Sequence, residues 1–145
     1  MSIIRKIKSY TSFSHEFKRI LLLACYFSFI IECRLLLGLI GSYKSLYQNE
    51  TSRISKIENP KTINRVRRAI KMIESNAFWR PKCHNSALTA KKIFLLHGIN
   101  TNLHVGFRKK NNSVQGHAWI TLGNEVIIGQ IEDLNDYIED ASKAN

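Results

Sequence analysis

Residues 116–130 have the sequence GHAWITLGNEVIIGQ, and this stretch decides how the second half of the chain folds. Its apolar and polar side chains alternate, which is typical of a β-strand with one buried face. Gly123 and Asn124 then provide a two-residue signal for a tight turn, and β-branched residues follow it. The stretch therefore predicts a β-hairpin with His117, Trp119 and Thr121 on one side of its first strand.

A helix and one further strand are predicted before this hairpin. Residues 83–97 carry apolar side chains at helical spacing, and Gly98 follows where a C-terminal cap residue is expected. Residues 103–107 alternate as a strand does, and residues 109–113 are typical of a polar turn. The predicted fold class is therefore α+β, with one helix packed on a small antiparallel β-meander of three strands. Beyond Asp133 the acidic sequence predicts a helix that frays.

The N-terminal part of the chain is predicted to be helical and very apolar. Apolar side chains dominate from Phe13 to about Tyr47, but Glu32 and Arg34 interrupt the longest run. Each of these charges would cost about 2.5 to 3.5 kcal/mol near the centre of a bilayer. A helix packed on the protein is therefore favoured over a membrane-spanning one, with contact to a membrane surface as the second interpretation.

A polar linker is predicted to separate this helix from the rest. Residues 48–60 are rich in Asn and Ser, and Thr62 is expected to cap a helix that runs to about Asn76. We therefore expect residues 1–60 to form an N-terminal helical extension with its linker, and residues 61–145 to form the core with an acidic C-terminal tail.

Charge is unevenly distributed along the chain. The formal net charge is +11, and all of the excess lies in residues 1–110 because residues 111–145 are acidic. A basic body attracts anionic partners, but the sequence has no aromatic-and-basic stripe, zinc finger or helix-turn-helix pattern, so nucleic acid is not expected to be one. One face of the helix predicted after Thr62 carries four basic residues, which are Arg65, Arg67, Arg68 and Lys71. This face is either simply solvated or a docking surface for an acidic partner.

The cysteines indicate a reduced protein. Cys25, Cys33 and Cys83 are odd in number, and no cleavable signal peptide is evident. We therefore expect a cytoplasmic protein, with membrane association as a further option. Neither C-x-x-C nor paired His and Cys spacing occurs, so no metal site is predicted and no cofactor is implied.

Cys83 is the candidate nucleophile because it precedes a helix. In a first helical turn its sulfur would lie among backbone N–H groups and the positive end of the helix dipole, which favour the thiolate. The backbone amides near Cys83 and His84 are candidates to hold an oxyanion. The alternative is that Cys83 is a small buried apolar residue, as most free cysteines are.

His117 is the candidate base. If Leu122 faces Glu125 across the turn, counting back sets His117 opposite Gln130, which is then placed to orient the imidazole. Glu132, two residues later, is the charged substitute for Gln130. Two other histidines are weaker candidates for the base. His84 directly follows the cysteine, and His104 is expected to pack in the sheet.

These residues together resemble a known family. The chain has Trp79, then C-x-x-x-A-L from Cys83, G-I at 98–99, L-H-V-G at 103–106 and G-H-A-W at 116–119, with Gly123 after it. In order and spacing this is similar to the leader peptidase of lasso-peptide biosynthesis, a member of the transglutaminase-like cysteine-protease superfamily. The resemblance covers about residues 62–132.

The resemblance implies a transglutaminase-like, or papain-like, core and a peptidase. Cys83 matches the nucleophile and His117 the base, and the third residue, an acid in the family, falls to Gln130 or Glu132. The implied substrate is the leader segment of a ribosomally made precursor peptide. The implied partners are a separate leader-recognition protein and an ATP-dependent lasso cyclase. Another thioester-forming acyltransferase and a non-catalytic peptide-binding scaffold are the alternatives.

Overall fold

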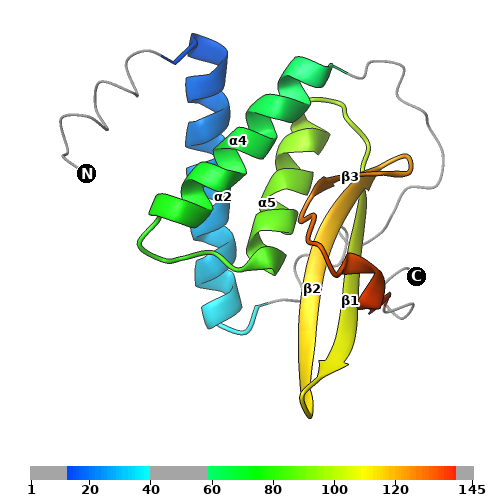
Figure 1. Cartoon of the computed structure of the whole chain (residues 1–145). Coiled ribbons are helices and arrows are strands. Elements are labelled where there is room, and N and C mark those ends of the chain that lie inside the picture. Colours follow the sequence, from blue (N-terminus) through cyan, green and yellow to red (C-terminus); the bar gives the residue numbers. More distant parts are fainter. Residues whose placement is uncertain (1–12, 40–58, 140–145) are drawn as a thin grey trace.

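The structure, a computed structural model, describes residues 13–39 and 59–139. Within them lie three long helices, α2 (His15–Leu36), α4 (Pro60–Asn76) and α5 (Cys83–Leu96). Figure 1 shows the three helices packed against one another, with the sheet beside α5. The N-terminus of α5, where Cys83 lies, is directed toward the sheet at the end where the β1–β2 hairpin extends beyond the helices.

The sheet has four antiparallel strands in the order β3-β2-β1-β4. They are β1 (Asn102–Lys110), β2 (Ser113–Leu122), β3 (Glu125–Ile128) and β4 (Ile138–Glu139). The α+β class and the three-strand meander are confirmed. The helix expected beyond Asp133 is wrong: a short 3-10 turn (Leu134–Asp136) leads into β4, which pairs with the edge of β1. Pairing there satisfies backbone groups that an exposed sheet edge would leave open.

The helix boundaries differ from the predicted ones at their caps. The side chain of Ser14 caps α2, and the helix ends at Leu36, just before Gly38 with its φ of +69°. Asn59, not Thr62, caps α4, and Thr62 is buried inside the helix. The predicted continuation to residue 47 and the linker at 48–58 lie outside the described residues. No helix in residues 13–39 or 59–139 is long and apolar enough to cross a membrane.

Helix α2 shares one hydrophobic core with α4, α5 and the sheet. Phe17, Ile20, Ala24 and Ile31 of α2 are buried in it. The division of the chain near residue 60 stays a prediction, because residues 40–58 are not described.

A polar bridge also joins α2 to α5. The amide of Asn85, 1% exposed, accepts hydrogen bonds from the hydroxyls of Ser28 and Thr89 and donates to the Ser28 carbonyl and the Glu32 carboxylate. The indole N–H of Trp79 donates to the Ser28 hydroxyl at 2.9 Å. All four hydrogen-bonding positions of the Asn85 amide are thus used. This bridge fixes the first turn of α5, which carries Cys83.

We expect Asn85→Ala to lower the free energy of unfolding by about 2 to 3 kcal/mol, because the substitution leaves the buried Ser28 and Thr89 hydroxyls without their acceptor. Urea titration measures the loss. Asn76→Ala is the matched control, since Asn76 is exposed and makes one bond within its own helix, to the carbonyl of Met72. Equal losses for the two variants would contradict a stabilising role for the bridge.

Candidate active site

The thiol of Cys83 lies in the first turn of α5, as predicted. The first hydrogen bond of the helix runs from the Ser86 N–H to the Lys82 carbonyl, so the amides before Ser86 lack partners within the helix. The backbone N–H groups of His84 and Ala118 hydrogen-bond to the Cys83 sulfur. These donors, one from the helix and one from β2, favour the thiolate.

The side chain of His117, on β2, forms a hydrogen bond with this thiol. Above all, their hydrogen bond lowers the pKa of the Cys83 thiol, against the opposing effect of burial. The same bond with Cys83 raises the pKa of His117, with the backbone of Gly129 adding to the rise. Both shifts favour the thiolate–imidazolium form over the neutral pair, and the two groups titrate as a pair.

The carbonyl of Gly129 sets the tautomer of His117. It lies 2.7 Å from Nε2 of the imidazole, and a carbonyl only accepts, so Nε2 carries the proton. In the neutral ring Nδ1 is then the nitrogen that accepts a proton from the thiol. Glycine is required at this place. The φ of Gly129 is +82°, and a Cβ there would lie only 2.7 Å from the Ala118 carbonyl oxygen.

The register of β2 and β3 differs from the predicted one by a single residue. Leu122 faces Glu125 as expected, but a bulge follows and Ile120, not Trp119, pairs with Ile128. The extra residue on β3 brings the Gly129 carbonyl, rather than the Gln130 side chain, to the imidazole. No alternation pattern signals such a bulge, because both of its sides are β-branched or aromatic.

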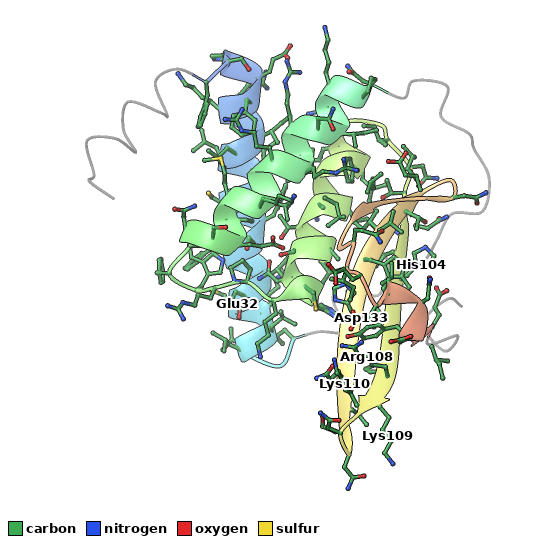
Figure 2. The ribbon with its side chains drawn as sticks, in the orientation of Figure 1. Glu32, His104, Arg108, Lys109, Lys110 and Asp133 are labelled. Carbon is green, nitrogen blue, oxygen red and sulfur yellow. The ribbon has the colours of Figure 1, made fainter. Side chains whose placement is uncertain are left out.

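Of the two candidates for the third residue, Gln130 lines the same cleft as Cys83 and His117, whereas Glu132 is not among the cleft residues. The Gln130 amide donates to the Ile131 carbonyl at 3.3 Å, and Glu132 is exposed. A carboxylate that the sequence analysis did not select acts on the imidazole instead. Asp133 raises the pKa of His117 electrostatically, and the guanidinium of Arg108 holds the Asp133 carboxylate, whose own pKa is lowered mainly by that contact. Figure 2 shows Arg108 and Asp133 next to each other beside the strands.

The other sulfur and imidazole groups have different surroundings. His104 hydrogen-bonds to Glu139 through Nδ1 and to Thr121 through Nε2, and its ring stacks on Trp119. His104 therefore packs in the sheet, as expected. Burial raises the pKa of the Cys25 thiol.

A cleft of about 520 Å³ opens beside the thiol–imidazole pair. Residues of α4, α5, β2, β3 and the segment after β3 line it. Its volume is sufficient for a peptide side chain. Apolar wall residues include Ile70, Val126, Ile127, Ile128 and Ile131, and charged ones include Arg67, Lys71 and Glu74. In the part of the chain that the structure describes, no three His, Cys, Asp or Glu side chains gather as a metal site would require.

The four basic residues of α4 do not form one open surface. Arg65 pairs with Glu16 at 2.5 Å, and Arg67 donates to the Ile127 carbonyl at 3.0 Å. The guanidinium of Arg68 lies over the Phe13 and Phe17 rings at 4.8 and 4.9 Å from their centroids. These three side chains therefore contribute to packing. Arg67 and Lys71 both line the cleft, and Lys71 is exposed.

Comparison with known proteins places this geometry in a family. A sequence model of the transglutaminase-like superfamily matches residues 28–139, which is most of the chain. The match includes residues 28–36 of α2 as well as the helix, strands and turn that surround Cys83 and His117. No curated protein and no solved structure matches the chain significantly.

We expect iodoacetamide to alkylate Cys83 with a midpoint below about pH 8.5, the usual range of a free thiol, because its pKa is lowered. Peptide-resolved mass spectrometry measures the rate at each pH, with Cys25, whose pKa is raised, as the internal comparison. In His117→Ala the midpoint of Cys83 should rise. Coincident curves for Cys83 and Cys25 in the wild type would contradict the pairing.

We expect Gly129→Ala to displace the carbonyl that orients His117 and to move the alkylation midpoint of Cys83 upward. Gly123→Ala is the matched control, because Gly123 also has a positive φ, +57°, but a Cβ there meets open space. Both variants lose about 1 to 2 kcal/mol of stability from the left-handed backbone. A wild-type alkylation profile in folded Gly129→Ala would show that the close approach to β2 does not matter for the pair.

Proposed function

We propose that this chain, which belongs to the transglutaminase-like superfamily, is a cysteine peptidase that acts through a thioester. Members of that superfamily are commonly cysteine-dependent enzymes. The observation that carries the proposal is the hydrogen bond between the Cys83 thiol, at the start of α5, and the His117 imidazole, both in the wall of one cleft. A nucleophile, a base and an orienting carbonyl are the parts that such a reaction needs.

In the first step the Cys83 thiolate attacks the scissile carbonyl carbon and forms a carbon–sulfur bond. The negative charge moves to the carbonyl oxygen, where the amides of Cys83 and His84 at the helix N-terminus are the donors we assign to it. The peptide C–N bond then breaks, and Nδ1 of the His117 imidazolium gives its proton to the departing amine. The acyl group remains on Cys83 as a thioester.

In the second step water replaces the amine. Neutral His117 takes a proton from water through Nδ1 while the oxygen attacks the thioester carbonyl. The carbon–sulfur bond breaks, the acid product leaves and the thiolate–imidazolium pair is restored. Gly129 holds Nε2 through both steps, so one ring orientation serves as base and as acid.

The substrate we propose is the leader segment of a lasso precursor peptide. This finer assignment is supported by the order and spacing of the motifs around Trp79, Cys83 and His117, which resemble the lasso leader peptidases. Cleavage would free the N-terminus of the core peptide for ring closure by an ATP-dependent cyclase. A separate leader-recognition protein would present the precursor to the cleft.

Lys71 is the docking residue we propose for an acidic segment of the precursor or of that partner. Its side chain is exposed and borders both the cleft and a shallow groove on α4 formed by residues 64–76. The packing contacts of Arg65, Arg67 and Arg68 make them weaker candidates, because a partner would have to replace those contacts. Of the four basic residues on α4, Lys71 is therefore the one we propose for docking.

A second acyl acceptor is the main alternative. The same thioester could pass to an amine instead of water, as in amidation or transglutamination, and superfamily membership accommodates both outcomes. The mass of the product distinguishes them, because only transfer to an amine makes the product mass depend on the amine supplied.

Incubation of the purified chain with a lasso precursor and a leader-recognition protein tests the function. We expect cleavage by the wild type and a loss of about a thousandfold or more in Cys83→Ala, with Cys33→Ala as the matched control that keeps activity. In the same assay Lys71→Glu should raise KM with little change in kcat. Unchanged cleavage by folded Cys83→Ala would reject the peptidase, and binding of the precursor without any cleavage would identify a scaffold.

A further inference from the structure

Arg108 lies on β1, on the same face of the sheet as His117. In the pairing of β1 with β2, Arg108 stands opposite Gln115 and Gly106 stands opposite His117, and alternate residues of a strand share a face. A Cβ at Gly106 would come within 3.0 Å of the Trp119 ring and of a β4 carbonyl. The absence of that side chain lets the Trp119 ring and β4 lie close to β1 at this position.

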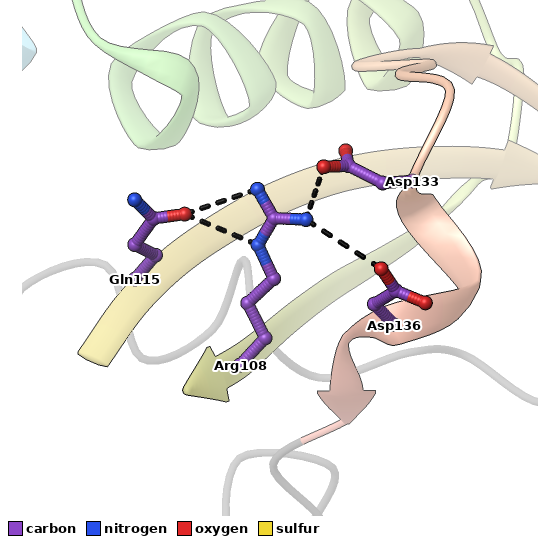
Figure 3. Close-up of polar contacts among 4 residues, drawn as sticks. All are labelled: Arg108, Gln115, Asp133 and Asp136. Carbon is purple, nitrogen blue, oxygen red and sulfur yellow. Dashed lines mark hydrogen bonds and ion pairs between the residues drawn. The ribbon is translucent and has the colours of Figure 1, made fainter. Parts of the chain in front are cut away.

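The guanidinium of Arg108 joins three elements, as Figure 3 shows. Nε and one terminal nitrogen donate to Oε1 of Gln115 on β2 at 3.1 and 3.0 Å. The other terminal nitrogen pairs with the Asp133 carboxylate and lies 3.7 Å from that of Asp136. Only 12% of the Arg108 side chain is exposed, so water competes weakly for these contacts. A planar fork of five donors suits this arrangement, and an ammonium group would not.

The same guanidinium also holds Tyr137. It lies over the ring at 4.7 Å from the centroid, which is within the range of a cation–π contact. The Tyr137 ring in turn lies 5.5 Å from the His117 ring, tilted by 51°. Arg108 is thus linked to the imidazole through the Tyr137 ring.

The charges of this cluster suit an imidazolium. Arg108 holds Asp133 and lies near Asp136, and the Asp133 carboxylate favours the protonated form of His117. Without the guanidinium the two carboxylates would repel each other across the 3-10 turn. We propose that Arg108 is a positioning residue, which holds the Tyr137 ring against the His117 ring and fixes the Asp133 carboxylate in the same cluster, and so maintains the thiolate–imidazolium pair. The proposal rests on the pair of the proposed function, but it applies to any thioester chemistry at Cys83.

Other charged and titratable groups surround the pair or the Asp133 carboxylate. Substitution of Arg108 leaves these groups in place, so their effect on the alkylation curve is the same in all variants. They come from α4, α5, β1 and β4 and are Arg67, Lys71, Glu74, His84, His104, Lys110 and Glu139.

The test compares the pH dependence of Cys83 alkylation in the full-length chain with Arg108→Gln, Asp133→Asn and both together. We expect each single variant to move the curve to higher pH and to slow alkylation at pH 6 by about threefold or more. The double variant should be no slower than Arg108→Gln alone, because Arg108→Gln already removes the contact that Asp133→Asn breaks. Iodoacetamide needs no peptide, so a failure to cleave precursor would not affect this result.

Lys109→Gln is the matched control, since it removes the same charge from an exposed position on the same strand. It should retain the wild-type curve. A curve for folded Arg108→Gln that coincides with that of Lys109→Gln would overturn the proposal. If circular dichroism shows Arg108→Gln unfolded, Gln115→Leu takes its place, because it removes only the acceptor of two guanidinium bonds. A smaller upward movement then supports the proposal, and a wild-type curve overturns it.

Discussion

The hydrogen bond between the Cys83 thiol and the His117 imidazole is the contact on which the chemistry of this molecule depends. It joins the first turn of a helix to the middle of a strand, and neither element alone would activate the sulfur. The helix contributes amides that favour negative charge, and the strand contributes a base whose tautomer is already set. The pair is therefore a product of how α5 and β2 pack, and anything that shifts one element against the other changes its ionisation.

Two features keep these elements in place, and they act from opposite sides. On the helical side, the Asn85 amide ties the first turn of α5 to Ser28 and Glu32 of α2. On the sheet side, Gly129 brings its carbonyl under the imidazole through a backbone conformation that other residues adopt only with strain. The family match begins at residue 28, on α2, which agrees with a role for this helix in supporting the site.

The sequence was most informative where periodicity and turn signals are local. The helix after Lys82, the two hairpins and the positions of Cys83 and His117 all followed from such patterns. The group that orients the imidazole did not follow from a local pattern. It depends on one bulged residue in β3, which moves every later residue by one place in the register. Gln130 and Glu132 were selected by counting along an unbroken strand. Asp133 becomes relevant only through Arg108, a partner 25 residues earlier, and no local pattern links the two.

Electrostatics near the site also differ from those of the whole chain. The chain carries a net charge of +11, yet the imidazole lies beside a cluster of two carboxylates and one guanidinium. A basic environment alone would stabilise the thiolate but disfavour an imidazolium next to it. The segment after β3 eases this conflict, because the amides of His84 and Ala118 hydrogen-bond to the sulfur while the Asp133 carboxylate raises the pKa of His117. The acidic part of the sequence that follows the basic body thus supplies one carboxylate that favours the imidazolium.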